Sequence, residues 1–189
     1  MKKVIYPLQT LAMLIGISVS VNAQTNPINV VTTAVPFLRI SPDARSGGMG
    51  DVGVATIPDA NSIFWNLSKI PFAKSNSAIA LTYTPWLKGL GLNDVYLVSG
   101  SGYYQLDDQQ AISASLRYFS LGNIQFTDAL GNPLQQYRPR EFSVDAGYSR
   151  KLSDKLGIGI ALRYINSNLA NGQSASGSTY KTGSAVAGD

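Results

Sequence analysis

The sequence predicts an all-β fold, an antiparallel β-barrel that spans a membrane, and three observations carry this prediction. Residues 141–150 and 156–164 alternate apolar side chains with polar residues or glycine, and a period of two is typical of β-strands. The N-terminus has the pattern of a secretory signal peptide. Short and long connections alternate along the chain, as they do in outer-membrane barrels. Because soluble sandwiches alternate too, the pattern alone is ambiguous, and the export signal favours the membrane barrel.

Residues 1–23 are predicted to be a signal peptide that is removed on export. A basic start, Lys2-Lys3, precedes an apolar run over residues 11–21, and cleavage is expected between Ala23 and Gln24. The run is shorter than the roughly 20 apolar residues that a membrane helix needs. No later stretch approaches that length, so residence in a membrane would have to be through strands.

The composition narrows the classes of function. About 166 residues remain after the signal peptide, enough for one domain. Charged residues make up 14% of the chain, well below the roughly 25% of soluble domains. The absence of cysteine and histidine excludes disulfides and thiol chemistry and argues against zinc, copper or haem sites. The formal charge of +4 falls to about +2 when the two signal lysines leave, and no basic cluster suits a phosphate backbone. We therefore predict no cofactor, no metal and no nucleic-acid partner.

Residues 24–76 are predicted to form an N-terminal segment that precedes the strands and contains short helices. Ser41, followed by proline, is a candidate cap for the first helix, and a second short helix is expected over residues 58–66. Between them, residues 52–56 read as a weak strand. Residues 48–53 also match the dinucleotide pattern G-x-G-x-x-G, but that fingerprint requires a preceding buried strand and a parallel βαβ unit. We interpret these glycines as a segment of close backbone packing against the barrel wall.

Residues 77–189 are predicted to be the first six strands of the barrel. Most are longer than the usual 5–6 residues of a globular strand and suit a tilted membrane strand of about 9–11. The connections at 106–108 and 153–154 are tight, whereas 122–139 and 167–179 are long and polar. This parity places the long loops outside the cell, with the brief outer connection at 88–92 as the exception. Because bacterial barrels use at least about eight strands, we expect this chain to be the N-terminal part of a larger barrel. The expected strands are 77–87, 93–105, 109–121, 140–152, 155–166 and one that begins near residue 180.

Two sets of side chains are candidates for function. Charged residues on the polar face of the strands are expected to line the interior, where an ion pair is the simplest role, because acid–base catalysis would need a cleft and a perturbed pKa. Aromatic residues near strand ends are expected at the membrane interface, with carbohydrate stacking as the alternative. The interior candidates are Arg117, Glu141, Asp145 and Arg163, and the candidates for the aromatic girdle are Tyr83, Trp86, Tyr118, Tyr148 and Tyr164.

Two segments closely resemble a known family. Residues 38–55 read LRISPDARSGGMGDVGVA, and residues 59–66 read DANSIFWN. They resemble the PorV family, also called LptO, whose members are outer-membrane barrel proteins of the type IX secretion system and relatives of the FadL-like (OmpP1) transporters. The resemblance runs from about residue 28 to the end of the chain. Where the family usually reads Trp-Asn-Pro-Ala, this chain has Trp65-Asn66-Leu67-Ser68, which makes the local turn less rigid.

The resemblance implies a FadL-like barrel of about fourteen strands, with residues 24–76 as a plug inside it, and a carrier that is not an enzyme. PorV-like proteins are thought to accept secreted cargo by its C-terminal signal domain from the translocon channel. They then deliver it to a sortase-like attachment complex at the cell surface. The implied partners are that channel subunit, the cargo domains, the attachment complex and outer-membrane lipid, and the implied location is the outer membrane of a Gram-negative cell.

Two other hypotheses remain at this point. A FadL-like transporter of small hydrophobic molecules would share the fold and the plug, and would need an apolar pocket between plug and wall. An exported soluble β-domain, an enzyme or an adhesin, would appear in the periplasm without detergent. If cargo binds, the external loop over residues 122–139 and its neighbouring aromatic residues are the expected region, because loops on a rigid scaffold carry recognition.

Overall fold

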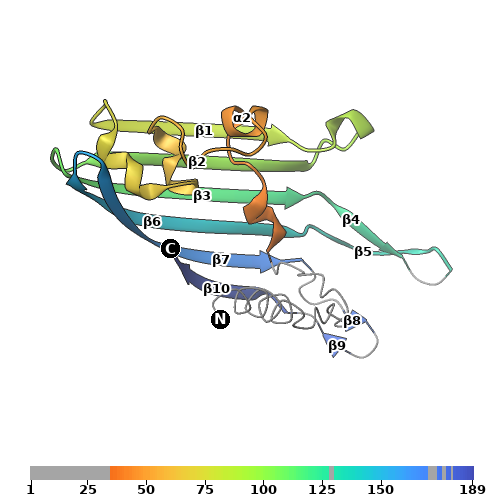
Figure 1. Cartoon of the computed structure of the whole chain (residues 1–189). Helices are drawn as coiled ribbons and strands as arrows, with labels where there is room; N and C mark the ends of the chain where they lie inside the picture. The colour runs from red at the N-terminus through yellow and green to blue at the C-terminus, as the bar shows by residue number, and fades with distance from the viewer. Residues whose placement is uncertain (1–34, 128–129, 170–173, 176–177, 180) are drawn as a thin grey trace, which may run out of the picture. The chain divides into compact units, whose positions relative to one another are not determined.

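One antiparallel sheet of six strands forms the body of the chain. The computed structural model describes residues 35–127, 130–169, 174–175, 178–179 and 181–189, so the cleavage residues Ala23 and Gln24 lie outside the described part. The strand order is β1-β2-β3-β6-β7-β10, and every neighbouring pair is antiparallel (Figure 1). The strands are β1 Ser77–Pro85, β2 Val95–Gln105, β3 Gln110–Leu121, β6 Arg140–Ser153, β7 Leu156–Asn168 and β10 Gly183–Gly188.

These six strands correspond to the six expected from sequence, whereas the two long connections differ from expectation. Each contains a short two-stranded hairpin instead of an irregular loop. The first hairpin pairs β4 Ile124–Thr127 with β5 Pro133–Tyr137 and extends past the ends of β3 and β6 (Figure 1). The second pairs β8 Ser174–Ala175 with β9 Ser178–Thr179. The polar composition of these connections concealed the pairing of their backbones.

The two faces of the sheet have opposite chemistry. Along β3, Ser113, Ser115 and Arg117 are buried, while Ile112 and Leu116, which alternate with them, are exposed. We call the first face the inner face and the second the outer face. The alternation continues across the sheet because the strands pair in register. Exposed apolar side chains of the outer face include Ile79, Leu81, Tyr83, Ile112, Leu116, Val144, Tyr148, Ile158, Ile160, Leu162 and Tyr164.

Four short helices from the N-terminal residues lie across the inner face (Figure 1). They are η1 Pro36–Arg39, α2 Ala44–Gly48, η2 Ala60–Phe64 and η3 Leu67–Phe72. A fifth, η4 Lys88–Leu90, connects β1 to β2. In the described part of the chain, none of the helices has the length and apolar character needed to cross a membrane.

Side-chain caps decide where these helices begin. Asp43, not the expected Ser41, caps α2, because its carboxylate lies 2.9 Å from the Ser46 amide at the N3 position. Asp59 caps η2 with a reciprocal bond from its own amide to Ser62 Oγ, which confirms the expected second helix. The strand expected over 52–56 is wrong, because residues 54–55 form a turn across which Thr56 Oγ1 donates to the Gly53 carbonyl at 2.9 Å.

A small core joins the helices to the sheet. Ile70 of η3 is fully buried and clusters with Tyr103 and Ala111 from β2 and β3. Burying such an aliphatic side chain contributes about 1.5–3 kcal/mol. Gln105 adds polar attachment, since its Nε2 donates to the carbonyl oxygens of Ile70 and Ala73. The end of the N-terminal segment is thus fixed to the inner face.

Candidate functional site

The inner face brings together two of the predicted interior residues in a polar row across three strands. Ser115, Asp145 and Arg163 are consecutive partners on β3, β6 and β7. The Asp145 carboxylate is 1% exposed, accepts a hydrogen bond from Ser115 Oγ at 2.7 Å and forms an ion pair with Arg163. Because a buried carboxylate is costly without partners, these two groups account for its position.

Arg117 lies on the same face but takes a different role. Its guanidinium is buried and donates through NH1 to the carbonyl oxygens of Leu38 and Ile40, at 2.7 and 3.3 Å. It also lies over the ring of Phe64, 4.3 Å from the ring centre, in cation–π geometry. Arg117 therefore binds the N-terminal residues to the sheet instead of joining the ion pair.

Glu141 is the fourth predicted interior residue and is also buried. One carboxylate oxygen accepts a hydrogen bond from Ser167 Oγ at 2.6 Å. It is four positions from Asp145 along β6, which corresponds to about 13 Å of strand, too far for a shared carboxylate pair. In the described ranges, no group of three or more histidine, cysteine, aspartate or glutamate residues could hold a metal ion. The buried charges Arg117, Glu141 and Asp145 of the inner face each have a partner within the fold.

The glycines of β7 form the seat of η3, a role that the sequence interpretation missed. A Cβ on Gly157 would lie less than 3.0 Å from the main-chain oxygen of Ser68 and 2.9 Å from the ring of Phe72. Leu67 lies over Gly147 and Gly159 in the same way. The alternation of glycine with apolar residues in β7 was the signal in the sequence, because only glycine allows another backbone to approach so closely.

In the glycine-rich segment 48–53, Gly53 packs closely, but its partner is not the sheet, and a Cβ on Gly48 or Gly50 would meet no atom within 4 Å. A Cβ on Gly53 would lie less than 3.0 Å from the indole ring of Trp65, so the expected packing against the wall is wrong. Lys69 Nζ holds the loop by donating to the Gly53 carbonyl at 2.6 Å and to Thr56 Oγ1 at 2.9 Å. Desolvation by burial lowers the pKa of Lys69, while Asp59 opposes that shift. The loop that contains these glycines is therefore held by contacts within the N-terminal segment, through Trp65 and Lys69.

Aromatic side chains form a row on the outer face near the β4–β5 end of the sheet. Ring centres lie 5.5 Å apart for Tyr83 and Tyr96, and 6.2 Å apart for Tyr96 and Tyr118. Phe142 pairs with Tyr118 across the strands and lies 6.1 Å from Tyr164. Tyr96 was missed because its strand carries aromatic or apolar residues on both faces, and Phe142 was assigned to the apolar face of its strand but not to the girdle.

The other two girdle candidates lie elsewhere. Tyr148 is on the outer face at the opposite end of β6, where its hydroxyl bonds Gln110 at 2.6 Å. Trp86 follows β1, half-exposed, with its ring edge-on to Phe119 at 6.3 Å. The outer face thus carries aromatic groups at both ends of its apolar band, as expected of a face in contact with two membrane interfaces.

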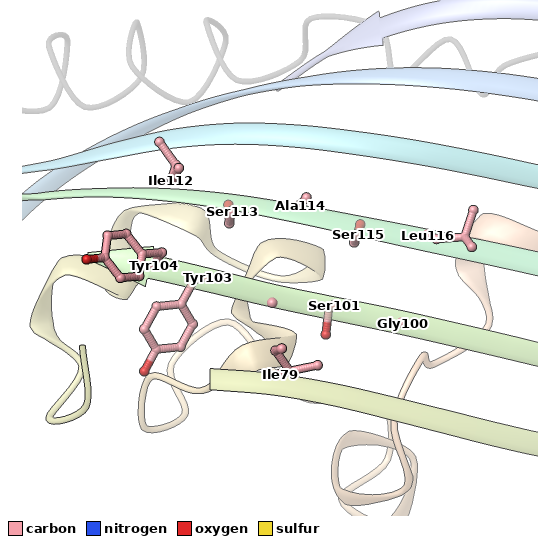
Figure 2. A pocket seen from close by; sticks show the side chains of 11 residues that line it. Ile79, Gly100, Ser101, Tyr103, Tyr104, Ile112, Ser113, Ala114, Ser115 and Leu116 are labelled. Atoms are coloured by element: carbon pink, nitrogen blue, oxygen red, sulfur yellow. The ribbon is translucent and has the colours of Figure 1, made fainter. Parts of the chain in front are cut away.

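A shallow apolar hollow of about 570 Å³ lies between these ends (Figure 2). Its floor is the backbone around Gly100 and Gly102, where the outer face has no side chains. Figure 2 shows Ile79, Ile112 and Leu116 around it. Gly100 and Gly102 belong to β2, and the lining contains no titratable group other than tyrosine. The hollow can take alkyl groups, and it offers no group for acid–base chemistry.

The comparisons define the class of protein. A family model described as "Type IX secretion system protein PorV" matches residues 22–188, nearly the whole chain. No curated protein matches the chain. The chain is therefore an outer-membrane component of the type IX secretion system. Within that class it belongs to the PorV family, as the resemblance of residues 38–66 predicted.

Proposed function

We propose that this chain forms a wall and plug of an outer-membrane β-barrel that carries secreted proteins between two machines. It accepts the C-terminal signal domain of cargo from the translocon channel and delivers it to the surface attachment complex, without catalysing a reaction itself. The single observation that carries this proposal is the family match over residues 22–188.

The two faces of the sheet support the membrane part of the proposal. The outer face is apolar over five strands, with aromatic residues towards both ends. The inner face is polar and is covered by the N-terminal segment. In lipid, an apolar face needs no partner, whereas backbone groups must be satisfied by neighbouring strands. The continuous antiparallel ladder meets that requirement between β1 and β10.

The β4–β5 hairpin is the part of the chain that we assign to cargo. It projects past β3 and β6 at the end of the sheet that carries the aromatic row (Figure 1). Ile124 is 42% exposed, and Phe126 packs against Tyr137 with ring centres 6.5 Å apart. Two short paired strands with exposed apolar side chains can bind an extended segment of another protein.

The test compares two exposed aliphatic residues at the same end of the sheet in a strain lacking the gene. Ile124→Ser changes the hairpin, and Leu92→Ser changes the loop between β1 and β2, where Leu92 is 43% exposed. Pull-down of the intact protein should recover the translocon channel subunit with both variants. Cargo recovery should fall about tenfold with Ile124→Ser alone, which corresponds to about 1.4 kcal/mol of binding. Normal secretion and anchoring of cargo in the deletion strain would refute the carrier role.

A second candidate function, transport of small hydrophobic molecules, has one observation in its favour. A hollow of about 630 Å³ lies between the N-terminal segment and β7. Ile63, Phe64 and Leu67 line one side, and Gly157 and Gly159 the other. Asn66 and Ser68 add polar atoms, so the hollow is less apolar than a fatty-acid site requires. Uptake of a radiolabelled fatty acid that falls on deletion of the gene, with cargo secretion unchanged, would favour this function.

A further inference from the structure

The N-terminal segment is attached to the sheet in two different ways. From α2 onward it is bound firmly, by the seat of η3, by the core around Ile70, and by internal bonds such as Trp65 Nε1 to Asp43. Residues 35–40, which precede α2, are different. In the described residues, the hydrogen bonds shown from the sheet to residues 35–40 come from one side chain, Arg117. We call residues 35–40 the strap.

The strap lies beside the polar residues of β6, since Arg117, which binds the strap carbonyls, is the cross-strand partner of Ser143. Figure 1 shows η1 crossing β6 on the inner face, towards β7. Glu141, Ser143 and Asp145 of β6 are 2%, 0% and 1% exposed. Ser143 Oγ is buried without a hydrogen-bond partner. Because water would satisfy this hydroxyl, the covered arrangement loses hydration that an open arrangement would regain.

Apolar burial and Arg117 oppose that opening. Phe37 of the strap is 1% exposed, so opening would return its ring to water. Arg117 would also lose the two strap carbonyls and its cation–π contact with Phe64. The strap is therefore held closed by the burial of Phe37 and by the contacts of Arg117. The hydration that Ser143 would regain on opening acts against them.

Arg117 has a second partner within reach. It lies opposite Ser143 on β6, and Asp145 is two residues further along the same face. Diagonal neighbours of this kind are about 7–8 Å apart at Cα, which an arginine side chain can span. A buried guanidinium must keep a partner of opposite charge or a set of acceptors. Asp145 can supply one, although it is bound to Arg163 and Ser115 in the covered state.

We propose that the strap is a gate over the inner face, closed when Arg117 binds the carbonyls of Leu38 and Ile40 and open when Arg117 turns to Asp145. Opening uncovers the polar side chains of Glu141 and Ser143, while α2, η2 and η3 stay in place. This device is a property of the chain's own fold. It goes beyond the proposed cargo role and does not depend on it.

The absence of cysteine from the chain allows a direct test. Ser143→Cys places a thiol on the inner face under the strap, and Ser149→Cys places one on the same face of the same strand, 1% exposed, at the other end of β6. The full chain in detergent micelles is reacted with a hydrophilic maleimide, and the labelling rate of each thiol is measured. When opening and closing are fast, this rate reports the fraction of molecules that is locally open.

Two variants then weaken the closed gate from opposite sides. Arg117→Gln removes the charged donor from β3 and leaves the ion pair of Asp145 intact, whereas Phe37→Ala removes apolar burial from the strap itself. We expect each to raise the labelling rate at position 143 about tenfold or more, and to leave position 149 within about twofold. This pattern would support the gate.

Two other results would overturn the proposal. An unchanged rate at position 143 in both variants would show that the strap does not control access to β6. Equal gains at positions 143 and 149 in both variants would show that the N-terminal segment detaches as a whole. If Arg117→Gln prevents folding, the thiols at positions 143 and 149 would react equally fast in that variant. The labelling rates measured with Phe37→Ala then decide whether the gate exists. Cargo secretion takes no part in the measurement, so failure of the gate is distinguishable from failure of the carrier role.

Discussion

Substituting alanine for Gly157 should loosen the N-terminal segment from the sheet without disturbing the strands. The added Cβ would lie less than 3.0 Å from the main-chain oxygen of Ser68, whereas ordinary van der Waals contact begins at 3.4 Å. The oxygen belongs to the backbone of η3 and cannot rotate away, so the helix must shift by more than about 0.4 Å. The nearby ring of Phe72, at 2.9 Å, blocks one direction of that shift.

The cost follows from this overlap. Overpacking of a well-packed contact costs about 1–3 kcal/mol, which lowers the ratio of docked to undocked segment about 5- to 150-fold. Gly183→Ala is the matched control, because it lies in the same sheet and its Cβ would meet only the oxygen of Ser167, at 3.9 Å. At such an open site, alanine is expected to be neutral or to stabilise by up to about 1 kcal/mol.

The two tryptophans of the chain provide the assay. Trp86→Phe leaves Trp65, which packs against Gly53 within the N-terminal segment, as the single reporter. Urea titration of its emission should show a lower midpoint for Gly157→Ala than for the parent, and an unchanged or higher midpoint for Gly183→Ala. Coincident midpoints for the two alanine variants would refute the assignment of β7 as the seat of η3.

Two further predictions concern the outer face and Lys69. Leu162→Arg, at an outer-face position that is 64% exposed, should destabilise the folded protein in lipid by about 2–4 kcal/mol, and Leu152→Arg near the end of β6 by about 0–1 kcal/mol. Folded fractions in urea-titrated lipid vesicles measure both, and equal losses would contradict a lipid-facing outer face. Burial lowers the pKa of Lys69 in the folded protein below its ordinary value of 10.5. Between the folded and the unfolded pKa, the unfolded state binds more protons. The free energy of unfolding should therefore rise with pH in that range. Urea unfolding at about pH 8 and about pH 10 should show this rise for the parent and a smaller one for Lys69→Met.

Local pattern was sufficient for the strands and for the chemistry of their faces. Alternation in residues 141–150 and 156–164 depends on which neighbours are apolar, and the pleat of a strand converts that order directly into two faces. The same logic placed Arg117, Glu141, Asp145 and Arg163 on one side of the sheet, where the structure also has them.

The alternation of residues along a strand did not predict which side chains contact each other across the fold. Four inward charges suggested an ion pair, yet no periodicity distinguishes Arg163, which pairs with Asp145, from Arg117, which binds the carbonyls of Leu38 and Ile40. The partner of Gly53 was misjudged for the same reason. A glycine permits a close approach, but which group approaches depends on how the chain folds back, and here that group is Trp65.

The sequence by itself determined the strands, their two faces and, through the segment over residues 38–66, the family, because each is encoded in residues that are close together along the chain. Only the tertiary structure decided the seat of η3 on Gly157 and the hold of Arg117 on the strap. Both join residues about 80 to 90 positions apart, and such contacts arise from the register and packing of the whole sheet, not from local preference.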